Sequence, residues 1–170
     1  ELRTILRHAV LTAALVLILS PHALGLWATA ALAAPLAYVP NNGSDSVSVI
    51  DTGTNAVIAT VPVGRFPFGV AVHPSGAFAY IGNGQDEDAV NAKTISVIDT
   101  TSNVVAATIV LGPAGRWAPT GLAVNPAGTR LYVGIASFDG SGVTPSVAVI
   151  DAATNTVIAT VPVGIAPATE

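Results

Sequence analysis

Hydrophobic residues occur in short runs along most of the chain, and each run ends near glycine, proline, asparagine or aspartate. In one representative unit this pattern predicts four strands, at Gly69–His73, Ala77–Gly82, Thr94–Asp99 and Val104–Val110. The third is apolar at nearly every position, which is typical of a strand covered on both faces. Turn sequences separate the strands, and no sustained helical periodicity occurs outside the N-terminal segment, so the pattern predicts an all-β fold.

The same unit returns along the chain. Ser46–Asp51 is repeated as Thr94–Asp99 and again as Ser146–Asp151. The segment after each of these also recurs, as Asn55–Gly64, Asn103–Gly112 and Asn155–Gly164. Self-similarity at about 40–50 residues, with four short strands per unit, is typical of β-propellers. We therefore expect about three four-stranded antiparallel blades, in pieces spanning residues 36–63, 68–111 and 120–163 of a partial propeller at 34–170.

The repeats resemble the YVTN β-propeller family. The tetrad that names the family is present as Tyr38–Asn41, Tyr80–Asn83 and Tyr132–Ile135, always without the threonine and once without the asparagine. Ser46–Gly64 and Ser146–Gly164 match the longer family pattern closely, and the resemblance covers residues 37–165. It implies a propeller, usually of seven blades, of the kind found in cell-surface and surface-layer proteins.

The first 33 residues have the features of a secretory signal peptide. Arg3 and Arg7 precede an uncharged run at Ala9–Leu19, and Ala31-Leu32-Ala33 forms an A-x-A cleavage site. The alternative is an uncleaved membrane anchor, although Pro21 and His22 interrupt the apolar stretch. We expect an exported protein that is periplasmic, cell-surface or secreted, touching a membrane only through this segment if it is uncleaved.

Composition narrows the possible functions. The chain has no cysteine, which excludes disulfides and thiolate metal sites, and its net charge of −4 argues against nucleic-acid binding. It also has no methionine and stops as a new repeat opens, so we expect a fragment of a longer reading frame.

The lengths of the connections point to one candidate binding face. The spacing from Asp51 to Gly64 is 13 residues and is unchanged in both later repeats. By contrast, the spacing from Tyr38 to Asp51 is 13, but the corresponding spacings in the later repeats are 19. The connection between repeats also lengthens, by four residues, before Gly121. In an up-and-down blade these variable connections emerge on one side, and insertions on one face often mark a binding face. The alternative is drift on a face that tolerates insertion.

Residues in and beside these connections are the candidate binding residues. They are Phe66, Phe68, Asp86, Glu87, Asp88, Arg116, Trp117, Phe138 and Asp139. The three consecutive acidic residues could bind Ca²⁺, although their spacing matches no known calcium loop and such a run is usually just solvated. Arg116 and Trp117 are a residue pair common in recognition sites, with burial of the tryptophan between blades as the alternative. No cofactor is otherwise evident.

Catalytic motifs are missing from this sequence. His73 is the only histidine after the N-terminal segment, so no histidine metal site or Ser-His-Asp set can be assembled from it, and we expect it to be a turn residue. Asp51, Asp99 and Asp151 recur once per repeat, as expected for turn-capping residues. The sequence favours a binding or scaffolding module for a protein or glycan ligand. The alternative is the propeller part of a periplasmic oxidoreductase, an electron-transfer subunit or a lactonase-like hydrolase.

Overall fold

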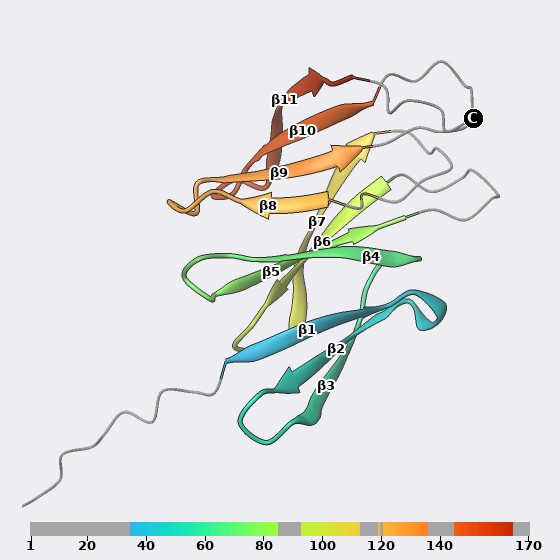
Figure 1. Cartoon of the computed structure of the whole chain (residues 1–170), viewed down its shortest axis with the longest axis vertical. Helices are drawn as coiled ribbons and strands as arrows, with labels where there is room; N and C mark the ends of the chain where they lie inside the picture. Colours follow the sequence, from blue (N-terminus) through green and yellow to red (C-terminus); the bar gives the residue numbers. More distant parts are fainter. Residues whose placement is uncertain (1–34, 85–92, 113–118, 120, 136–144, 165–170) are drawn as a thin grey trace, which may run out of the picture. The chain divides into compact units, whose positions relative to one another are not determined.

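The computed structural model describes residues 35–84, 93–112, 119, 121–135 and 145–164. Within these ranges the chain forms three antiparallel sheets (Figure 1). The first has the order β1 (Leu36–Asn41), β2 (Ser46–Asp51) and β3 (Ala56–Pro62), with a short 3-10 turn, η1 (Asn42–Ser44), between its first two strands. The second has the order β4 (Pro67–Val72), β5 (Phe78–Asn83), β6 (Lys93–Asp99) and β7 (Val104–Gly112). The third has the order β8 (Gly121–Val124), β9 (Arg130–Ile135), β10 (Ser146–Asp151) and β11 (Thr156–Pro162).

The predicted strands are confirmed, with small shifts at their ends. Each strand pairs with the next along the chain, which is the meander expected of a blade. The largest differences are at β4, which begins at Pro67 rather than Gly69, and at β7, which ends at Gly112 rather than Val110. The pairing of β4 with β5 shifts register between Pro67 and Gly69. This irregularity lets β4 extend to Pro67, beyond the regular apolar pattern from which its start was predicted. β6 is buried along most of its length, as expected for a strand covered on both faces.

The repeated aspartates cap tight turns, as predicted. Asp99 Oδ1 accepts hydrogen bonds from the backbone N–H groups of Thr101 and Ser102, at 2.9 and 2.8 Å. Asn103, directly before β7, has a φ of 54°, in the left-handed region that asparagine tolerates. The same two features recur at Asp51 and Asp151. The backbone N–H donors, chiefly those of Thr54, Ser102 and Thr154, lower the pKa of these three carboxyl groups.

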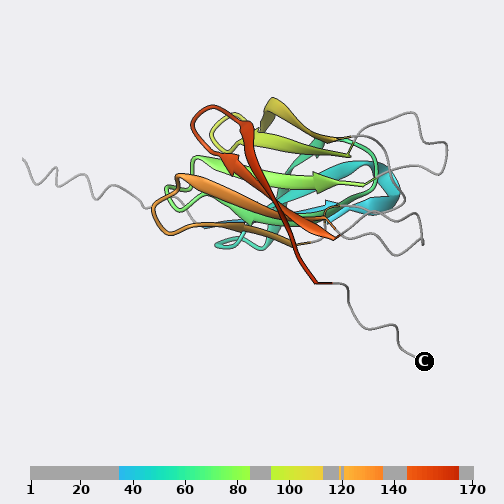
Figure 2. The ribbon, with the colours of Figure 1, turned by 90° about the horizontal axis from the view of Figure 1, so that it is seen from above.

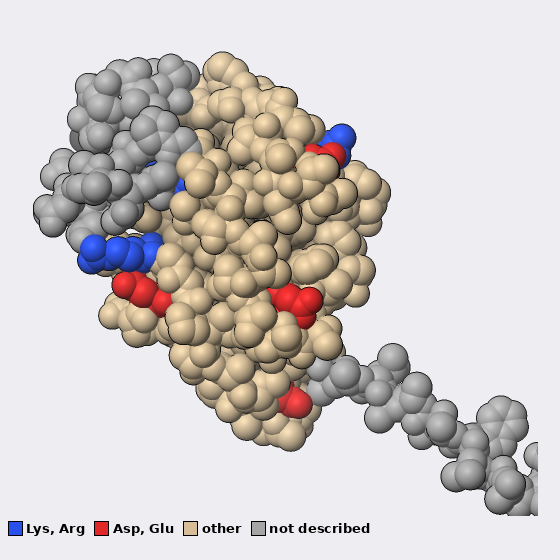
Figure 3. Space-filling model, turned by 180° about the vertical axis from the view of Figure 1, so that it is seen from behind, with Lys and Arg blue, Asp and Glu red and all other residues tan. Residues whose placement is uncertain are grey.

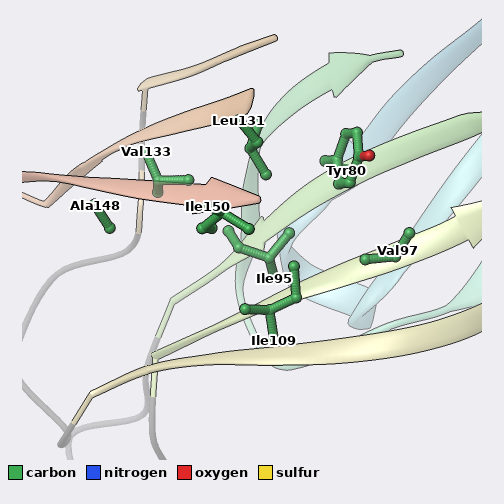
Figure 4. Close-up of a cluster of buried hydrophobic side chains, with 8 residues drawn as sticks. All are labelled: Tyr80, Ile95, Val97, Ile109, Leu131, Val133, Ala148 and Ile150. Carbon is green, nitrogen blue, oxygen red and sulfur yellow. The ribbon is translucent and has the colours of Figure 1, made fainter. Parts of the chain in front are cut away.

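Two hydrophobic clusters hold neighbouring sheets together. One joins the second and third sheets and contains Tyr80, Ile95, Val97, Ile109, Leu131, Val133, Ala148 and Ile150 (Figure 4). The other joins the first and second sheets and contains Tyr38, Val47, Val49, Val61, Ala79, Ile81 and Ile98. β4 lies beside both β1 and β8, while the longer β7 lies beside β3 and β11. The first sheet has three strands in the described part of the chain, rather than the four expected of a blade, and the other two sheets have four. Face-to-face packing of successive antiparallel meanders gives a propeller-like arrangement.

The predicted signal peptide or anchor at residues 1–33 lies outside the described residues. Among the residues that the structure describes, no helix has the length and apolar character needed to span a membrane.

Candidate binding end of the sheets

Every variable connection leaves the sheets at the same end. In the second sheet, strand pairing places Asn83 opposite Thr94 and Lys93 opposite Gly112, so the strand ends that flank these connections are neighbours. In the third sheet, Ser146 pairs with both Ile135 and Pro162. We call this the insertion end, and we call the opposite end, with the constant aspartate turns, the turn end. Figures 1 and 2 show the constant turns gathered at one end of the three sheets.

Two of the predicted binding residues are described by the structure. Phe66 lies in the connection between the first and second sheets, at the insertion end. Phe68 was expected in the same connection but lies within β4, because that strand begins at Pro67. The others lie outside the described residues, and their binding role stays a prediction: Asp86, Glu87, Asp88, Arg116, Trp117, Phe138 and Asp139.

The backbone of Phe66 is held in an unusual conformation. Its φ is 48°, a left-handed value that is rare for a bulky side chain and costs free energy. Two bonds hold it there: its N–H donates to Asp45 Oδ1 at 2.9 Å, and its carbonyl accepts from the Gly84 N–H at 2.9 Å. Phe66 therefore links the β1–β2 turn of one sheet to the end of β5 in the next.

An arginine and a second phenylalanine lie next to this residue in the sequence. The Arg65 guanidinium carbon lies 5.5 Å from the centre of the Phe66 ring, within the range of a cation–π contact. Phe68 is 62% exposed, although its neighbour Pro67 is buried. The exposed ring of Phe68 can contact an apolar or planar ligand surface. We call Arg65, Phe66 and Phe68 the aromatic group.

Sequence reasoning missed a buried polar network next to Gly64, the residue before the aromatic group. Asn83 is 1% exposed, and its Nδ2 donates to Thr94 Oγ1 at 3.0 Å and to Ser96 Oγ at 2.9 Å. Its Oδ1 is buried with no hydrogen-bond partner. Gly64 lies so close that an added Cβ would be 2.6 Å from Asn83 Cγ, which only glycine avoids. The network ties the sheet interior to the connection that carries Phe66.

The network is present in two sheets and replaced in the third. In the first sheet, Asn41 Nδ2 donates to Ser46 Oγ at 3.3 Å and Ser48 Oγ at 2.9 Å, at the positions of Thr94 and Ser96. In the third sheet the asparagine is Ile135 and the serine is Ala148, and both belong to or pack against the hydrophobic cluster. The amide donor and the serine acceptor are therefore both absent from the third sheet, so neither is left buried without its partner. The sequence shows that the third tetrad lacks its asparagine. It does not show that this asparagine bonds to a serine on the next strand, because that requires the strand pairing.

Residues at the turn end have structural roles. His73 Nε2 lies 2.9 Å from the carbonyl oxygen of Gly128, which joins the turns of neighbouring sheets. Its Nδ1 accepts from the Ser75 N–H at 3.1 Å, so Nε2 carries the hydrogen and donates to Gly128 in the neutral ring. The prediction that His73 is a turn residue is confirmed, and its contact with the neighbouring sheet is new. Arg130 forms an ion pair with Asp151 at 2.6 Å.

Charge and metal ligands are sparse in the described part of the chain. Charged side chains of both signs are scattered over a mostly uncharged surface in the view of Figure 3. Among the described residues, no cluster of histidine, aspartate and glutamate side chains is suited to hold a metal ion. The acidic residues proposed for Ca²⁺ lie outside these ranges, so that site stays a prediction.

Solved structures resemble this chain, although no protein-family model and no curated protein matches it. Hydrazine synthase from Kuenenia stuttgartiensis is 28% identical, with a TM-score of 0.65 over 75% of this chain and 34% of that chain. Dihydro-heme d1 dehydrogenase NirN, in complex with DHE, is 21% identical, with a TM-score of 0.56 over 76% of this chain and 24% of that one. A functionally unknown protein from Desulfotomaculum acetoxidans DSM 771 is 13% identical, with a TM-score of 0.56 over 77% of this chain and 38% of that one.

The matches support a propeller-like fold. Hydrazine synthase and NirN are β-propeller proteins, and each match covers about three quarters of this chain. This chain spans well under half the length of each of these three proteins. The chain is therefore an all-β, propeller-like module of antiparallel sheets.

Proposed function

We propose that this chain is an exported propeller module of the YVTN-repeat type, and that its insertion end binds a protein or glycan ligand outside the cytoplasm. The observation that carries the proposal is the contrast between the two ends of the sheets. The turns at the turn end keep their length, and those after β2, β6 and β10 keep their aspartate caps, whereas the connections at the insertion end vary. Variable loops on a rigid scaffold are where binding sites concentrate.

The aromatic group supports this assignment. Phe68 stays largely exposed, and Phe66 keeps a strained backbone that glycine or asparagine would adopt at lower cost. Strained backbone is tolerated most often at functional sites, where the side chain matters more than the local stability. Planar aromatic side chains beside arginine suit the apolar faces of sugar rings and the side chains of protein partners.

Binding can be tested with probes of both kinds. The full chain would be applied to a glycan array and sedimented with purified peptidoglycan sacculi, alongside the variant Phe68→Ser. The matched control is Val104→Ser, since Val104 is similarly exposed but lies next to the constant Asp99 turn. We expect the Phe68 variant to lose binding and the Val104 variant to keep it. Equal loss in both variants, or binding that neither change affects, would place the ligand elsewhere.

A second candidate function is the propeller part of an exported redox enzyme or electron-transfer subunit. The observation that favours it is the 28% identity with hydrazine synthase over 75% of this chain. In that case the chain would supply a scaffold, because the described residues hold no group of metal-ligating side chains. A visible absorption band that copurifies with the chain, or tight binding of a haem protein, would favour this function over the first.

A further inference from the structure

Asp45 holds the connection from β3 to β4 through two hydrogen bonds. Its carbonyl accepts from the Val63 N–H at 3.0 Å, and its Oδ1 accepts from the Phe66 N–H at 2.9 Å. Asp45 lies at the end of η1, in the turn between β1 and β2, and precedes Phe66 by 21 residues in the sequence. The first bond fixes the start of the connection, and the second fixes Phe66 itself. The position of Phe66 therefore depends on a residue of a different turn.

The carboxylate bond opposes the strain in the Phe66 backbone. A φ of 48° is a left-handed value that side chains other than glycine and asparagine avoid. A hydrogen bond from a backbone N–H to a carboxylate is roughly twice as strong as one between neutral groups. The second restraint on Phe66 is the Gly84 N–H, which donates to its carbonyl at 2.9 Å. Removal of the Asp45 side chain would leave this neutral bond to oppose the strain.

The junction between the second and third sheets has a different residue at the position of Asp45. Asp45 directly precedes Ser46, and strand pairing places Lys93 at the equivalent position of the second sheet. The lysine side chain donates hydrogen bonds and cannot accept one. The connection that leaves the second sheet, from Gly112 to Gly121, is also four residues longer. The carboxylate and the short connection therefore occur together, at the junction between the first and second sheets.

Asp45 and a buried proline hold the aromatic group from its two ends. Phe66 is half-buried and Phe68 is largely exposed, whereas Pro67 between them is fully buried. Pro67 anchors the segment on the side of β4, and Asp45 anchors it on the side of the connection. The Phe66 ring, with the Arg65 guanidinium carbon 5.5 Å from its centre, is thus held in place before a ligand arrives. A surface that is ordered in advance loses less entropy on binding.

We infer that Asp45 is a positioning residue for the ligand site, and that this site lies at the junction between the first and second sheets. The inference rests on the proposed function, because it names the part of the insertion end that contacts the ligand. Asp45 acts through the backbone of Phe66 and needs no contact with the ligand itself.

Four variants of the full chain isolate the side-chain bond. Asp45 itself has a φ of 51°, so Asp45→Gly removes the carboxylate without straining the turn, and Asp45→Asn keeps an acceptor oxygen. Asp51→Ala is the matched control, because Asp51 Oδ1 accepts two backbone N–H groups in the same sheet but at the turn end. Phe66→Gly adopts the left-handed conformation freely but lacks the ring. Circular dichroism and thermal melting would confirm that each variant is folded.

Fluorine NMR reports on Phe66 without any ligand. The chain has four phenylalanines, so labelling with 4-fluorophenylalanine gives four signals, and Phe66→Gly identifies one of them by removing it. We expect Asp45→Gly to shift or broaden the Phe66 signal, and Asp45→Asn and Asp51→Ala to leave it unchanged. The signal of Phe78, which opens β5 at the turn end, is the internal reference. A Phe66 signal that Asp45→Gly does not move overturns the inference.

Binding to peptidoglycan sacculi and to the glycan array gives the second measurement. We expect Asp45→Gly to weaken binding about 3- to 10-fold, which is the effect of one lost hydrogen bond. Asp45→Asn should keep most of the binding, and Asp51→Ala should keep all of it. Equal weakening in Asp45→Gly and Asp51→Ala, or none in Asp45→Gly, overturns the inference. If the wild type binds neither probe, the proposed function fails, and the fluorine signal alone decides whether Asp45 positions Phe66.

Discussion

Replacing the buried Asn83 network by the apolar pair found in the third sheet should cost less than the two single changes together. The amide of Asn83 donates to Ser96 at 2.9 Å and to Thr94 at 3.0 Å, and both Asn83 and Ser96 are buried. The third sheet carries Ile135 and Ala148 at the positions of Asn83 and Ser96. The perturbation is therefore Asn83→Ile, Ser96→Ala and the double variant.

The magnitudes follow from what each change leaves behind. Ser96→Ala removes one of the two acceptors of the Asn83 amide, which should cost about 0.5–1.5 kcal/mol. Asn83→Ile leaves the buried Ser96 hydroxyl without its amide donor, which should cost about 1–3 kcal/mol. The loss of Asn83 Oδ1, which is already buried without a partner, offsets part of that cost. We expect the double variant to be more stable than the sum of the single effects predicts, by about 1 kcal/mol.

Equilibrium unfolding in urea at one fixed protein concentration measures all four free energies. Concentration must be held constant because association would add to the apparent stability. The equivalent pair in the first sheet, Asn41 and Ser48, is a built-in comparison: the bond has the same length of 2.9 Å, but the pair is only half-buried. Its coupling should be smaller. If the destabilisation of the double variant at Asn83 and Ser96 equals the sum of the two single effects to within about 0.3 kcal/mol, the reasoning is refuted.

Three further outcomes are expected from the described contacts. Gly82→Ala should destabilise the fold by about 1–3 kcal/mol, because its new Cβ would lie 2.5 Å from the Pro119 carbonyl oxygen. Gly121→Ala is the control: its new Cβ meets no atom within 4 Å, so the melting temperature should be nearly unchanged. Tyr38→Phe should leave the melting temperature unchanged or raise it, because the Tyr38 hydroxyl is buried without a hydrogen-bond partner. The pKa of Asp99 is lowered below 3.8 by the Ser102 and Thr101 N–H groups, so its stabilising effect is present above that pH and is lost as the pH falls through the folded value. Asp99→Asn should therefore flatten the acid side of a stability-against-pH curve, and an unchanged curve would show that the cap contributes nothing.

The fold could be predicted because its determinants are local and repeated. Apolar runs define each strand, and the aspartate followed four positions later by asparagine defines each tight turn, so every repeat reports the same structure. Repetition also revealed which connections change length, and therefore which end of the sheets varies.

The rest depends on contacts between distant residues. The left-handed conformation of Phe66 follows from bonds to Asp45 and Gly84, which are separated from it in sequence. The hydrogen bond from His73 to Gly128 spans 55 residues and joins two turns. Nothing in the local sequence of either turn indicates a contact with the other. Phe68 was assigned to a connection because the irregular pairing beside Pro67 hides the start of β4. Such features require the register and packing of the strands.

The central proposal is that the insertion end binds the ligand, and shortening one connection tests it most directly. The connection from β5 to β6 can be cut by six residues, to the length of the turn that follows β1, which the first sheet shows to be sufficient for an antiparallel pair. Binding of this variant and of the wild type to the glycan array and to peptidoglycan sacculi would be measured together. We predict that the variant keeps its circular dichroism spectrum and loses binding. A second variant would have the connection between β9 and β10 shortened in the same way. If both variants bind as tightly as the wild type, the proposal is contradicted.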